Sequence, residues 1–182
     1  MTKLITTVKE LVRALMTKPP GRSYLQLMKS VDIPLEDFEK YFTWNRDRYT
    51  RNSLVKTDDF ELLLVCWEKG QGSVVHDYDT HMAWVRTIHG ELKEERFMMF
   101  DGKLERVSSV HLGKEDFSYL AEPIAIHRYS NKADERTVSL HLYVGPIEEW
   151  TEYDLETGEK THKKVSHDSV YRFTDSGAVR VS

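Results

Sequence analysis

The sequence has little cysteine and no long apolar run. Cys66 is the only cysteine among 182 residues, so no internal disulfide can form, and a small secreted protein held by disulfides is excluded. We therefore expect a reducing, cytoplasmic location. No stretch of about 18 apolar residues could span a bilayer, and Lys3, Lys9 and Arg13 interrupt the apolar residues at the start of the chain. We expect neither a membrane partner nor a targeting segment.

An excess of basic residues is also missing. The chain has 30 acidic and 26 basic residues, for a formal net charge of -4, so it offers no positive field to attract a phosphate backbone. We expect no nucleic-acid partner. With 40% hydrophobic and 31% charged residues, the chain is too apolar for disorder and too charged for a membrane protein. Its composition and length predict a soluble protein with a single domain over residues 1–182, and we expect a monomer.

The first 44 residues carry a helical pattern. Apolar residues recur at spacings of three and four over residues 4–16, which is one face of a helix. A Pro-Pro-Gly run at residues 19–21 ends this pattern. Two shorter helices are predicted over residues 23–31 and 34–42, with Asp32 as the cap of the second.

After Trp44, short β-rich runs alternate with turn residues. The predicted strands cover residues 49–55, 60–67, 83–89, 92–100, 104–112, 117–126, 138–144 and 164–173. No helical patterns alternate with them, as a parallel sheet would require. The order of elements predicts a mainly β fold, a jelly-roll barrel over residues 45–182 with residues 1–44 as a helical cap.

Two further stretches carry histidines at positions suited to chemistry. In GQGSVVHDYDTHMAWVRTIHG, residues 70–90, His76 and Tyr78 are alternate residues of a strand and share one face. That arrangement suits a metal site. In IAIHRYSN, residues 124–131, His127 lies at the end of another apolar strand. A lone histidine is more often a hydrogen-bonded core residue than a ligand, so each histidine alone leaves both interpretations open.

The segment TVSLHLY, residues 137–143, places polar and apolar residues on opposite faces of a strand. Ser139, His141 and Tyr143 share one face, and leucines occupy the other. Either face could be the interior, because a polar face of a strand is often exposed to water. The remaining histidines are expected at the surface or in turns: His81, His89, His111, His162 and His167.

Taken together, these motifs resemble the cupin superfamily. The cupin pattern G-x5-H-x-H-x4-E-x6-G matches Gly70, His76 and Gly90 in register, and its companion H-x3-N matches His127 and Asn131. Within the superfamily the sequence is most similar to the cysteine dioxygenase family of thiol dioxygenases. The run RYTRN at residues 48–52 resembles that family's substrate-binding segment, and SLHLY at residues 139–143 resembles its Ser-His-Tyr relay. The likeness extends over about residues 44–146.

The resemblance implies an iron-dependent enzyme that oxidises a small thiol with O2. In this family three imidazoles hold Fe(II) in a β-barrel, and L-cysteine chelates the metal through sulfur and nitrogen before its sulfur is oxidised to the sulfinic acid. By this resemblance, His76 and His127 are two of the metal ligands. Arg51 would pair its planar guanidinium with the substrate carboxylate, and Tyr49 would line the same pocket.

The same resemblance assigns a catalytic relay to the strand at residues 137–143. Tyr143 would place its hydroxyl beside the bound sulfur or oxygen, His141 would be hydrogen-bonded to Tyr143, and Ser139 would orient the imidazole. The cysteine that in many members is joined to the catalytic tyrosine by a thioether is replaced by Ala83. Tyr143 is therefore expected to be uncrosslinked.

The main departure from the family pattern is Tyr78, which stands where the second metal histidine is expected. A tyrosine can ligate iron as phenolate, although the metal must displace a proton whose ordinary pKa is about 10. Alternatively, Tyr78 fills the space of a lost ligand, or His81 replaces it if a turn resets the strand alternation. The rival hypothesis is a non-catalytic cupin, or one of altered activity, that binds an amino acid or a metal.

Overall fold

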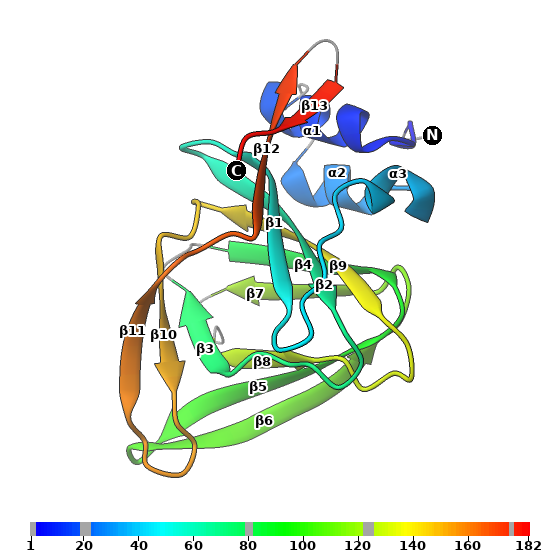
Figure 1. Cartoon of the computed structure of the whole chain (residues 1–182). Coiled ribbons are helices and arrows are strands. Elements are labelled where there is room, and N and C mark those ends of the chain that lie inside the picture. Colours follow the sequence, from blue (N-terminus) through cyan, green and yellow to red (C-terminus); the bar gives the residue numbers. More distant parts are fainter. Residues whose placement is uncertain (1–2, 19–22, 79–81, 122–125, 175–176) are drawn as a thin grey trace.

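The computed structural model describes residues 3–18, 23–78, 82–121, 126–174 and 177–182. Within these ranges, three short helices precede a long series of strands (Figure 1). The helices are α1 (Val8–Thr17), α2 (Tyr24–Lys29) and α3 (Leu35–Glu39). This order confirms the prediction of a mainly β chain with a helical N-terminal segment.

The strands form two sheets that together make a jelly-roll barrel (Figure 1). In spatial order, the first sheet contains β13 (Gly177–Arg180), β12 (Ser169–Thr174), β1 (Thr50–Lys56), β2 (Phe60–Trp67), β9 (Thr137–Val144), β4 (Met82–His89) and β7 (Phe117–Ala121). The second contains β11 (Lys160–Lys164), β10 (Glu149–Tyr153), β3 (Val75–Tyr78), β8 (His127–Ser130), β5 (Leu92–Phe100) and β6 (Lys103–Leu112). The chain crosses repeatedly between the sheets, for example from β2 to β3 and from β3 to β4, as jelly-roll connections require.

Capping side chains fix where the helices begin. The side chain of Thr7 accepts a hydrogen bond from the Glu10 amide at 3.1 Å, so α1 begins at Val8 and not at residue 4 as predicted. Before the cap, Ile5 instead pairs with Val31 in an isolated β-bridge. The cap predicted at Asp32 is also wrong, because Pro34 occupies the N-cap position of α3 without a side-chain hydrogen bond.

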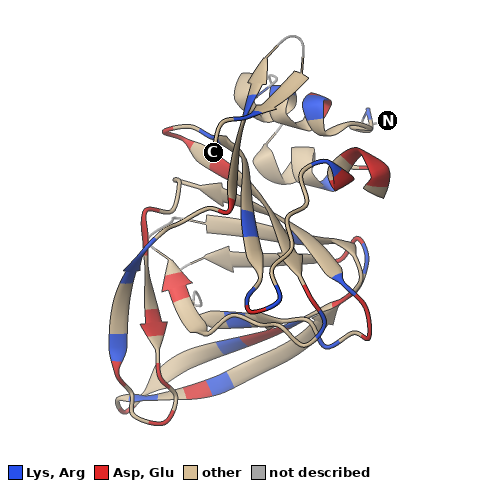
Figure 2. Cartoon of the chain, in the orientation of Figure 1, with Lys and Arg blue, Asp and Glu red and all other residues tan. Residues whose placement is uncertain are grey.

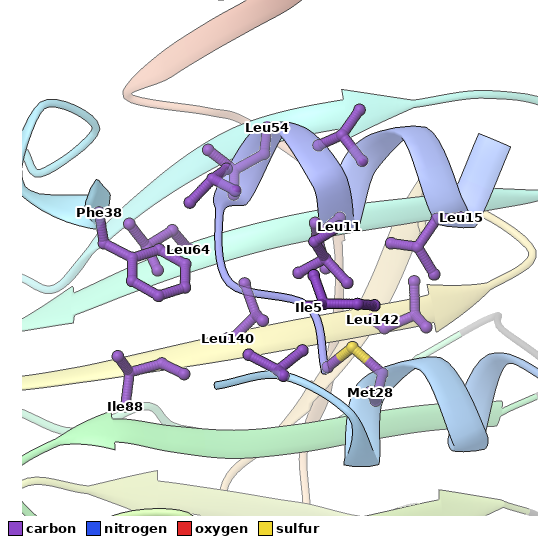
Figure 3. Close-up of a cluster of buried hydrophobic side chains, with 14 of the residues drawn as sticks. Ile5, Leu11, Leu15, Met28, Phe38, Leu54, Leu64, Ile88, Leu140 and Leu142 are labelled. Atoms are coloured by element: carbon purple, nitrogen blue, oxygen red, sulfur yellow. The ribbon is translucent and has the colours of Figure 1, made fainter. Parts of the chain in front are cut away.

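The central strands of the first sheet are buried on both faces. Leu64, Leu140 and Leu142 point from its central strands to the helices, where they pack with Leu11 and Met28 (Figure 3). The opposite face looks into the barrel and packs against the second sheet through a separate apolar cluster that includes Leu63, Val65, Val85, Tyr129 and Tyr143. The helices thus cover one face of the sheet, and the other face is free to line an internal site.

An ion cluster holds three strands of the second sheet in register. Glu95 on β5 contacts Arg106 on β6 and Arg128 on β8, each at 2.6 Å, and charged residues of both signs follow this part of the sheet (Figure 2). The hydrogen bonds from Arg128 and Arg106 lower the pKa of Glu95 to about 2. The carboxylate therefore stays ionised and keeps β6, β5 and β8 aligned.

Two predicted strands differ from the structure. The strand expected over residues 164–173 is two strands, because β11 ends at Lys164 in one sheet and β12 begins at Ser169 in the other. The strand expected over residues 117–126 is observed as β7 up to Ala121, and residues 122–125 lie outside the described ranges. His127 does not end that strand but begins β8. No helix within the described residues is long and apolar enough to cross a membrane.

Candidate active site

Two histidines face each other inside the barrel. β3 pairs with β8 so that His76 lies directly opposite His127, and their ring centroids are 4.5 Å apart. Their exposed fractions are 5% and 0%. The pairing explains how residues 51 positions apart in the sequence meet, and it confirms that strand alternation turns His76 into the interior.

The Tyr78 hydroxyl lies between the two imidazoles. Its oxygen is 2.8 Å from Nε2 of His76 and 3.2 Å from Nε2 of His127. Tyr78 is two residues from His76 on β3, so the alternation of the strand brings both side chains to the same face. Three potential metal donors, two nitrogens and one oxygen, therefore converge on one point.

The hydrogen bond behind His76 determines its tautomer. Nδ1 of His76 is 2.8 Å from the carbonyl oxygen of Val74. A carbonyl can only accept, so Nδ1 carries the proton and the lone pair of Nε2 faces the site. Burial, followed by the positive charge of Arg51, lowers the pKa of His76 to about 4. The imidazole is neutral at physiological pH, as metal ligation requires.

The spacing of the Tyr78 oxygen from each imidazole fits a transition-metal ion. Metal–nitrogen and metal–oxygen bonds of about 2.1 Å at right angles put neighbouring donor atoms about 3 Å apart. The distances of 2.8 and 3.2 Å from the Tyr78 oxygen to the two Nε2 atoms bracket that value. Within the described ranges, no group of three or more His, Cys, Asp or Glu side chains could hold a metal. The phenol is thus needed to complete a three-donor set here.

His81, the alternative third ligand, lies outside the described residues. Tyr78 itself is a poor anion without a metal, because burial raises its pKa well above the ordinary value and the neighbouring Tyr143 raises it further. In the metal-free protein the phenol therefore keeps its proton. A bound cation would have to displace that proton.

The second group of predicted residues lies on β9 and forms a continuous hydrogen-bonded series. Ser139 Oγ is 2.7 Å from Nε2 of His141, and Nδ1 of His141 is 3.1 Å from the Tyr143 hydroxyl. All three side chains are almost fully buried, with exposed fractions of 0–2%. The polar face of this strand is therefore the barrel interior, and the solvent-exposed alternative is wrong. Trp67 on β2 donates from Nε1 to Ser139 Oγ at 2.9 Å.

The bond from Tyr143 to Tyr78 sets the direction of this series. Tyr143 donates its only proton to the Tyr78 hydroxyl at 3.4 Å, so its oxygen accepts from Nδ1 of His141. His141 therefore carries its proton on Nδ1. Nε2 of His141 then accepts from Ser139, whose oxygen accepts from the indole N–H of Trp67. The relay and the metal donors thus belong to one hydrogen-bonded network.

Burial keeps every member of the relay neutral. Desolvation lowers the pKa of His141 to about 3, with Arg51 and His76 contributing in the same direction. Desolvation also raises the pKa of Tyr143 to about 12. At neutral pH the series therefore consists of a neutral imidazole and a protonated phenol that point a hydroxyl at the metal donors.

Ala83 lies directly opposite Tyr143 in the pairing of β4 with β9. This register explains why a cysteine at that position could reach the tyrosine, since residues paired across antiparallel strands have Cβ atoms about 5 Å apart. Alanine offers no sulfur, so Tyr143 has no thioether partner at this position.

Arg51 and Tyr49 line the wall of the site formed by β1 and its preceding residue. Arg51 is only 7% exposed, its guanidinium lies 5.3 Å from the ring centroid of Trp150, and its Nε and Nη2 have no hydrogen-bond partner among the described residues. Tyr49 stacks on Trp67 with ring centroids 4.5 Å apart. A buried guanidinium with unpaired N–H groups is suited to binding an anionic group.

Some residues of the site were not found from the sequence. No motif in the sequence marks Trp67, Trp150 or Glu61 as residues of a site. His167, expected at the surface or in a turn, lies in the connection between β11 and β12, but its side chain is largely buried and its Nε2 lies 2.7 Å from Oε1 of Glu61. Asn131, part of the H-x3-N motif, is fully buried and donates from Nδ2 to the backbone carbonyls of Trp67, at the end of β2, and Glu135.

Solved structures with similar architecture define the class of protein. The TT1209 protein of Thermus thermophilus aligns with a TM-score of 0.51 and 14% identity, over 60% of this chain and 95% of its own. A cupin-superfamily sugar phosphate isomerase from Silicibacter pomeroyi aligns with a TM-score of 0.50 and 16% identity, over 74% and 76% of the two chains. At such low identity these likenesses show the fold alone, which is that of a cupin barrel.

Sequence comparison places the chain within one family of this class. The family described as cysteine dioxygenase type I matches residues 1–156, a longer span than the motifs alone indicated. Cysteine dioxygenase type 1 of Danio rerio is 32% identical over 152 residues, covering 80% of this chain and 75% of the relative. The Rattus norvegicus enzyme is 31% identical over 168 residues, covering 84% of each chain. The chain belongs to the cysteine dioxygenase family, whose named members support thiol dioxygenase activity in general.

Proposed function

We propose that this protein is an iron-dependent thiol dioxygenase that oxidises L-cysteine, or a similar small thiol, to the sulfinic acid. The overall reaction is RSH + O2 → RSO2H, in which sulfur is oxidised by four electrons and both oxygen atoms of O2 end on sulfur. The observation that carries the proposal is the convergence of His76, His127 and Tyr78 at the end of the buried series Ser139–His141–Tyr143.

Fe(II) would be held by Nε2 of His76, Nε2 of His127 and the Tyr78 oxygen. When bound, the iron supplies the redox centre at which a thiolate and dioxygen can react, which amino-acid side chains alone cannot provide. The bond from His76 to the Val74 carbonyl orients the first imidazole and raises its basicity toward a metal. A phenolate in place of a neutral imidazole reduces the net positive charge at the metal and favours the ferric state.

Arg51 would bind the carboxylate of the substrate. Its two unpaired nitrogens form one edge of the planar guanidinium, which matches the two oxygens of a carboxylate. The Trp150 ring packs against one face of the Arg51 guanidinium. Tyr49 would form the neighbouring wall of the substrate pocket. These contacts would fix the orientation of the thiol before any reaction.

Tyr143 would place a proton donor beside the reacting atoms. The Tyr143 hydroxyl proton points toward Tyr78, and His141, Ser139 and Trp67 follow behind it in one hydrogen-bonded series. Because His141 is held as the Nδ1–H tautomer, it stabilises the Tyr143 oxygen if that hydroxyl donates its proton. His141 and Ser139 therefore act on the reaction through Tyr143.

A specific observation favours the second candidate, a non-catalytic cupin that binds an amino acid or a metal. The Tyr78 hydroxyl already bonds to both imidazoles, and these bonds satisfy the two nitrogens without a metal. If that arrangement persists in solution, Arg51 still provides an anion site in the barrel. The two candidates differ in whether the iron-loaded protein consumes oxygen with a thiol.

The distinguishing experiment measures metal content and oxygen uptake on the same sample. Purified protein is loaded anaerobically with ferrous iron, its iron is counted, and oxygen consumption is followed with L-cysteine, homocysteine and 3-mercaptopropionate. We expect about one iron per chain and uptake matched by sulfinic acid. His76→Ala and His127→Ala should each lose the iron. Bound iron without uptake on any thiol would support the non-catalytic candidate.

We further propose that residues 1–182 form one cupin domain, with residues 1–44 as a helical cap on the barrel. The shared apolar cluster of α1, α2 and the first sheet supports this organisation. We propose a monomer that works in the cytoplasm, where reducing conditions keep a small thiol substrate in its reduced form.

A further inference from the structure

Glu61 is a buried acid that the proposed reaction does not yet use. It lies on β2 directly opposite Tyr143 on β9, and its exposed fraction is 0%. Ser53 Oγ donates to its Oε1 at 3.1 Å, and Nε2 of His167 lies 2.7 Å from the same oxygen. Its other oxygen, Oε2, is buried and has no hydrogen-bond partner within the described part of the chain.

An acid at this position is unexpected for the strand that carries it. The rest of β2 is a continuous buried apolar run ending at Trp67, the pattern of a strand covered on both faces. A carboxyl oxygen buried without a hydrogen bond costs free energy that a leucine at the same place would not. Unpaired buried polar atoms of this kind are rare and concentrate at functional sites.

Arg51 carries the opposite charge on the same wall of the barrel. Ser53, which bonds Glu61, is two residues from Arg51 on β1, so the two side chains share a face. No ion pair joins Arg51 to Glu61 among the described side chains, and each retains buried polar atoms without a partner. The wall beside Tyr143 therefore presents unpaired N–H donors at one point and an unpaired carboxyl oxygen at another.

We propose that Oε2 of Glu61 accepts an N–H from the amino group of the substrate while Arg51 binds its carboxylate, so that Glu61 selects amino-acid thiols over thiols that carry a carboxylate alone. This inference rests on the proposed thiol oxidation. An amino group has N–H donors whether or not it is protonated, so the contact needs no particular charge state of the substrate. A thiol without the amino group leaves Oε2 unpaired and is disfavoured.

The test compares two thiols that differ by the amino group. Glu61→Gln keeps the size of the side chain and replaces one carboxyl oxygen, a hydrogen-bond acceptor, by an amide NH2, which can only donate. For this variant we expect kcat/KM for L-cysteine to fall about 10- to 100-fold, and that for 3-mercaptopropionate to change by less than about threefold. Ser53→Ala is the matched control, because it removes the contact to Oε1 and leaves Oε2 in place. It should keep the preference for L-cysteine.

Stability and binding measurements separate this role from a structural one. If Glu61 serves the substrate, Glu61→Gln should have a thermal midpoint no lower than that of the unchanged protein, because it removes an unpaired buried acid. A lower midpoint with equal losses for both thiols would overturn the inference while thiol oxidation still stood. If the iron-loaded protein oxidises neither thiol, the proposed reaction fails, and anaerobic calorimetry still decides the inference. In that case calorimetry must show that the unchanged protein binds L-cysteine more tightly than 3-mercaptopropionate. It must also show that Glu61→Gln binds the two thiols equally.

Discussion

At the scale of single residues, Tyr78 decides the chemistry of the site. Its hydroxyl touches both imidazoles and accepts from Tyr143, so it connects the metal donors to the relay. A histidine at this position would leave the Tyr143 proton without this acceptor. The replacement therefore changes two things together, the charge at the metal and the partner of the catalytic phenol.

Ligation by Tyr78 predicts a colour. In the ferric protein, a bound phenolate should give a visible charge-transfer band, and Tyr78→Phe should abolish it because the ring then lacks the donor oxygen. Absorption spectra of the iron-loaded, oxidised proteins check this. Tyr143→Phe is the matched control, since it removes a neighbouring phenol and should keep the band. A band that survives in Tyr78→Phe would show that Tyr78 is not a ligand.

Changing Tyr78→His tests whether the phenol limits turnover. A third neutral imidazole restores the positive charge of the site and favours Fe(II), so we expect higher oxygen uptake with L-cysteine than in the unchanged protein at equal iron content. Steady-state oxygen consumption normalised to bound iron gives the comparison. Equal or lower activity would mean that the surrounding network has adapted to the phenol.

Arg51 should contribute substantially to substrate binding. Because its guanidinium is buried and its free nitrogens have no other partner in the described protein, Arg51→Ala should weaken binding of carboxylate-bearing thiols by about 2 to 4 kcal/mol. Cysteamine, which has no carboxylate, serves as the control and should lose much less. The ratio of kcat/KM values for the two thiols measures the effect. An unchanged ratio would remove Arg51 from the pocket.

At the scale of elements, strand alternation made much of the site predictable. His76 and Tyr78 on one strand, and Ser139, His141 and Tyr143 on another, were assigned to common faces by the period of two, and the structure places them so. The position of His127 was harder, because it depends on where β7 ends and β8 begins. Strand breaks of this kind are set by tertiary pairing and not by local sequence.

Glu61 and His167 show what a single sequence cannot reveal. They lie 106 positions apart, and they meet because β12, which follows His167, pairs in parallel with β1. No local spacing indicates such a contact. The helical segment shows the converse case, since the start of α1 follows from a capping threonine that could have been read from the sequence.

A turn glycine gives a test of the strand connections. Gly90 has a φ of +73°, and a Cβ there would lie 2.4 Å from Oγ1 of Thr137 and 2.9 Å from the carbonyl oxygen of Arg136. We expect Gly90→Ala to lower the free energy of unfolding by roughly 2 to 4 kcal/mol, through strain and overlap together. Gly102→Ala is the matched control, because its φ is +79° with nothing described within 4 Å of the added Cβ.

In Gly102→Ala the free energy of unfolding should fall by only about 1 kcal/mol, which is the cost of placing alanine in a left-handed backbone conformation. Urea unfolding of the two variants gives the difference directly. If Gly90→Ala and Gly102→Ala lower the free energy of unfolding equally, the turn at residue 90 relaxes away from Thr137. The close approach of β4 to β9 then does not depend on glycine.

At the scale of the whole molecule, buried neutral histidines make stability depend on pH. In the unfolded chain His76 and His141 titrate near about 6.5, whereas burial lowers their folded pKa values to about 4 and 3. Between these values the unfolded state binds more protons than the folded state, so acid favours unfolding. For the metal-free protein, we expect the free energy of unfolding to fall by about 2 kcal/mol per histidine between pH 7 and pH 5.

Urea titrations at several pH values measure this slope. Because burial lowers the folded pKa of both rings, His141→Gln should remove about half of the slope. The window also lies above the range in which Glu95 affects stability, because the contribution of a carboxyl whose folded pKa is lowered to about 2 is lost only below its unfolded pKa of about 4.3. A flat profile from pH 7 to pH 5 would contradict neutral burial of the two rings.

The helical cap and the barrel should unfold together. Leu11 and Met28 from the helices share an apolar cluster with Leu64 and Leu142 of the first sheet, so melting the cap would expose one face of that sheet. We expect one transition with the same midpoint by far-ultraviolet circular dichroism and by tryptophan fluorescence. Two separated transitions would show that residues 1–44 are an independent unit.

The environment of the only cysteine has a practical consequence for measuring a thiol reaction. Cys66 is 1% exposed, and burial raises its pKa to about 12, so very little of its sulfur is in the nucleophilic form at neutral pH. Alkylating or disulfide reagents used to quench an assay should therefore react with the free substrate and spare the native polypeptide. A colorimetric count of remaining sulfhydryl then reports substrate consumption directly, without a correction that grows with enzyme concentration.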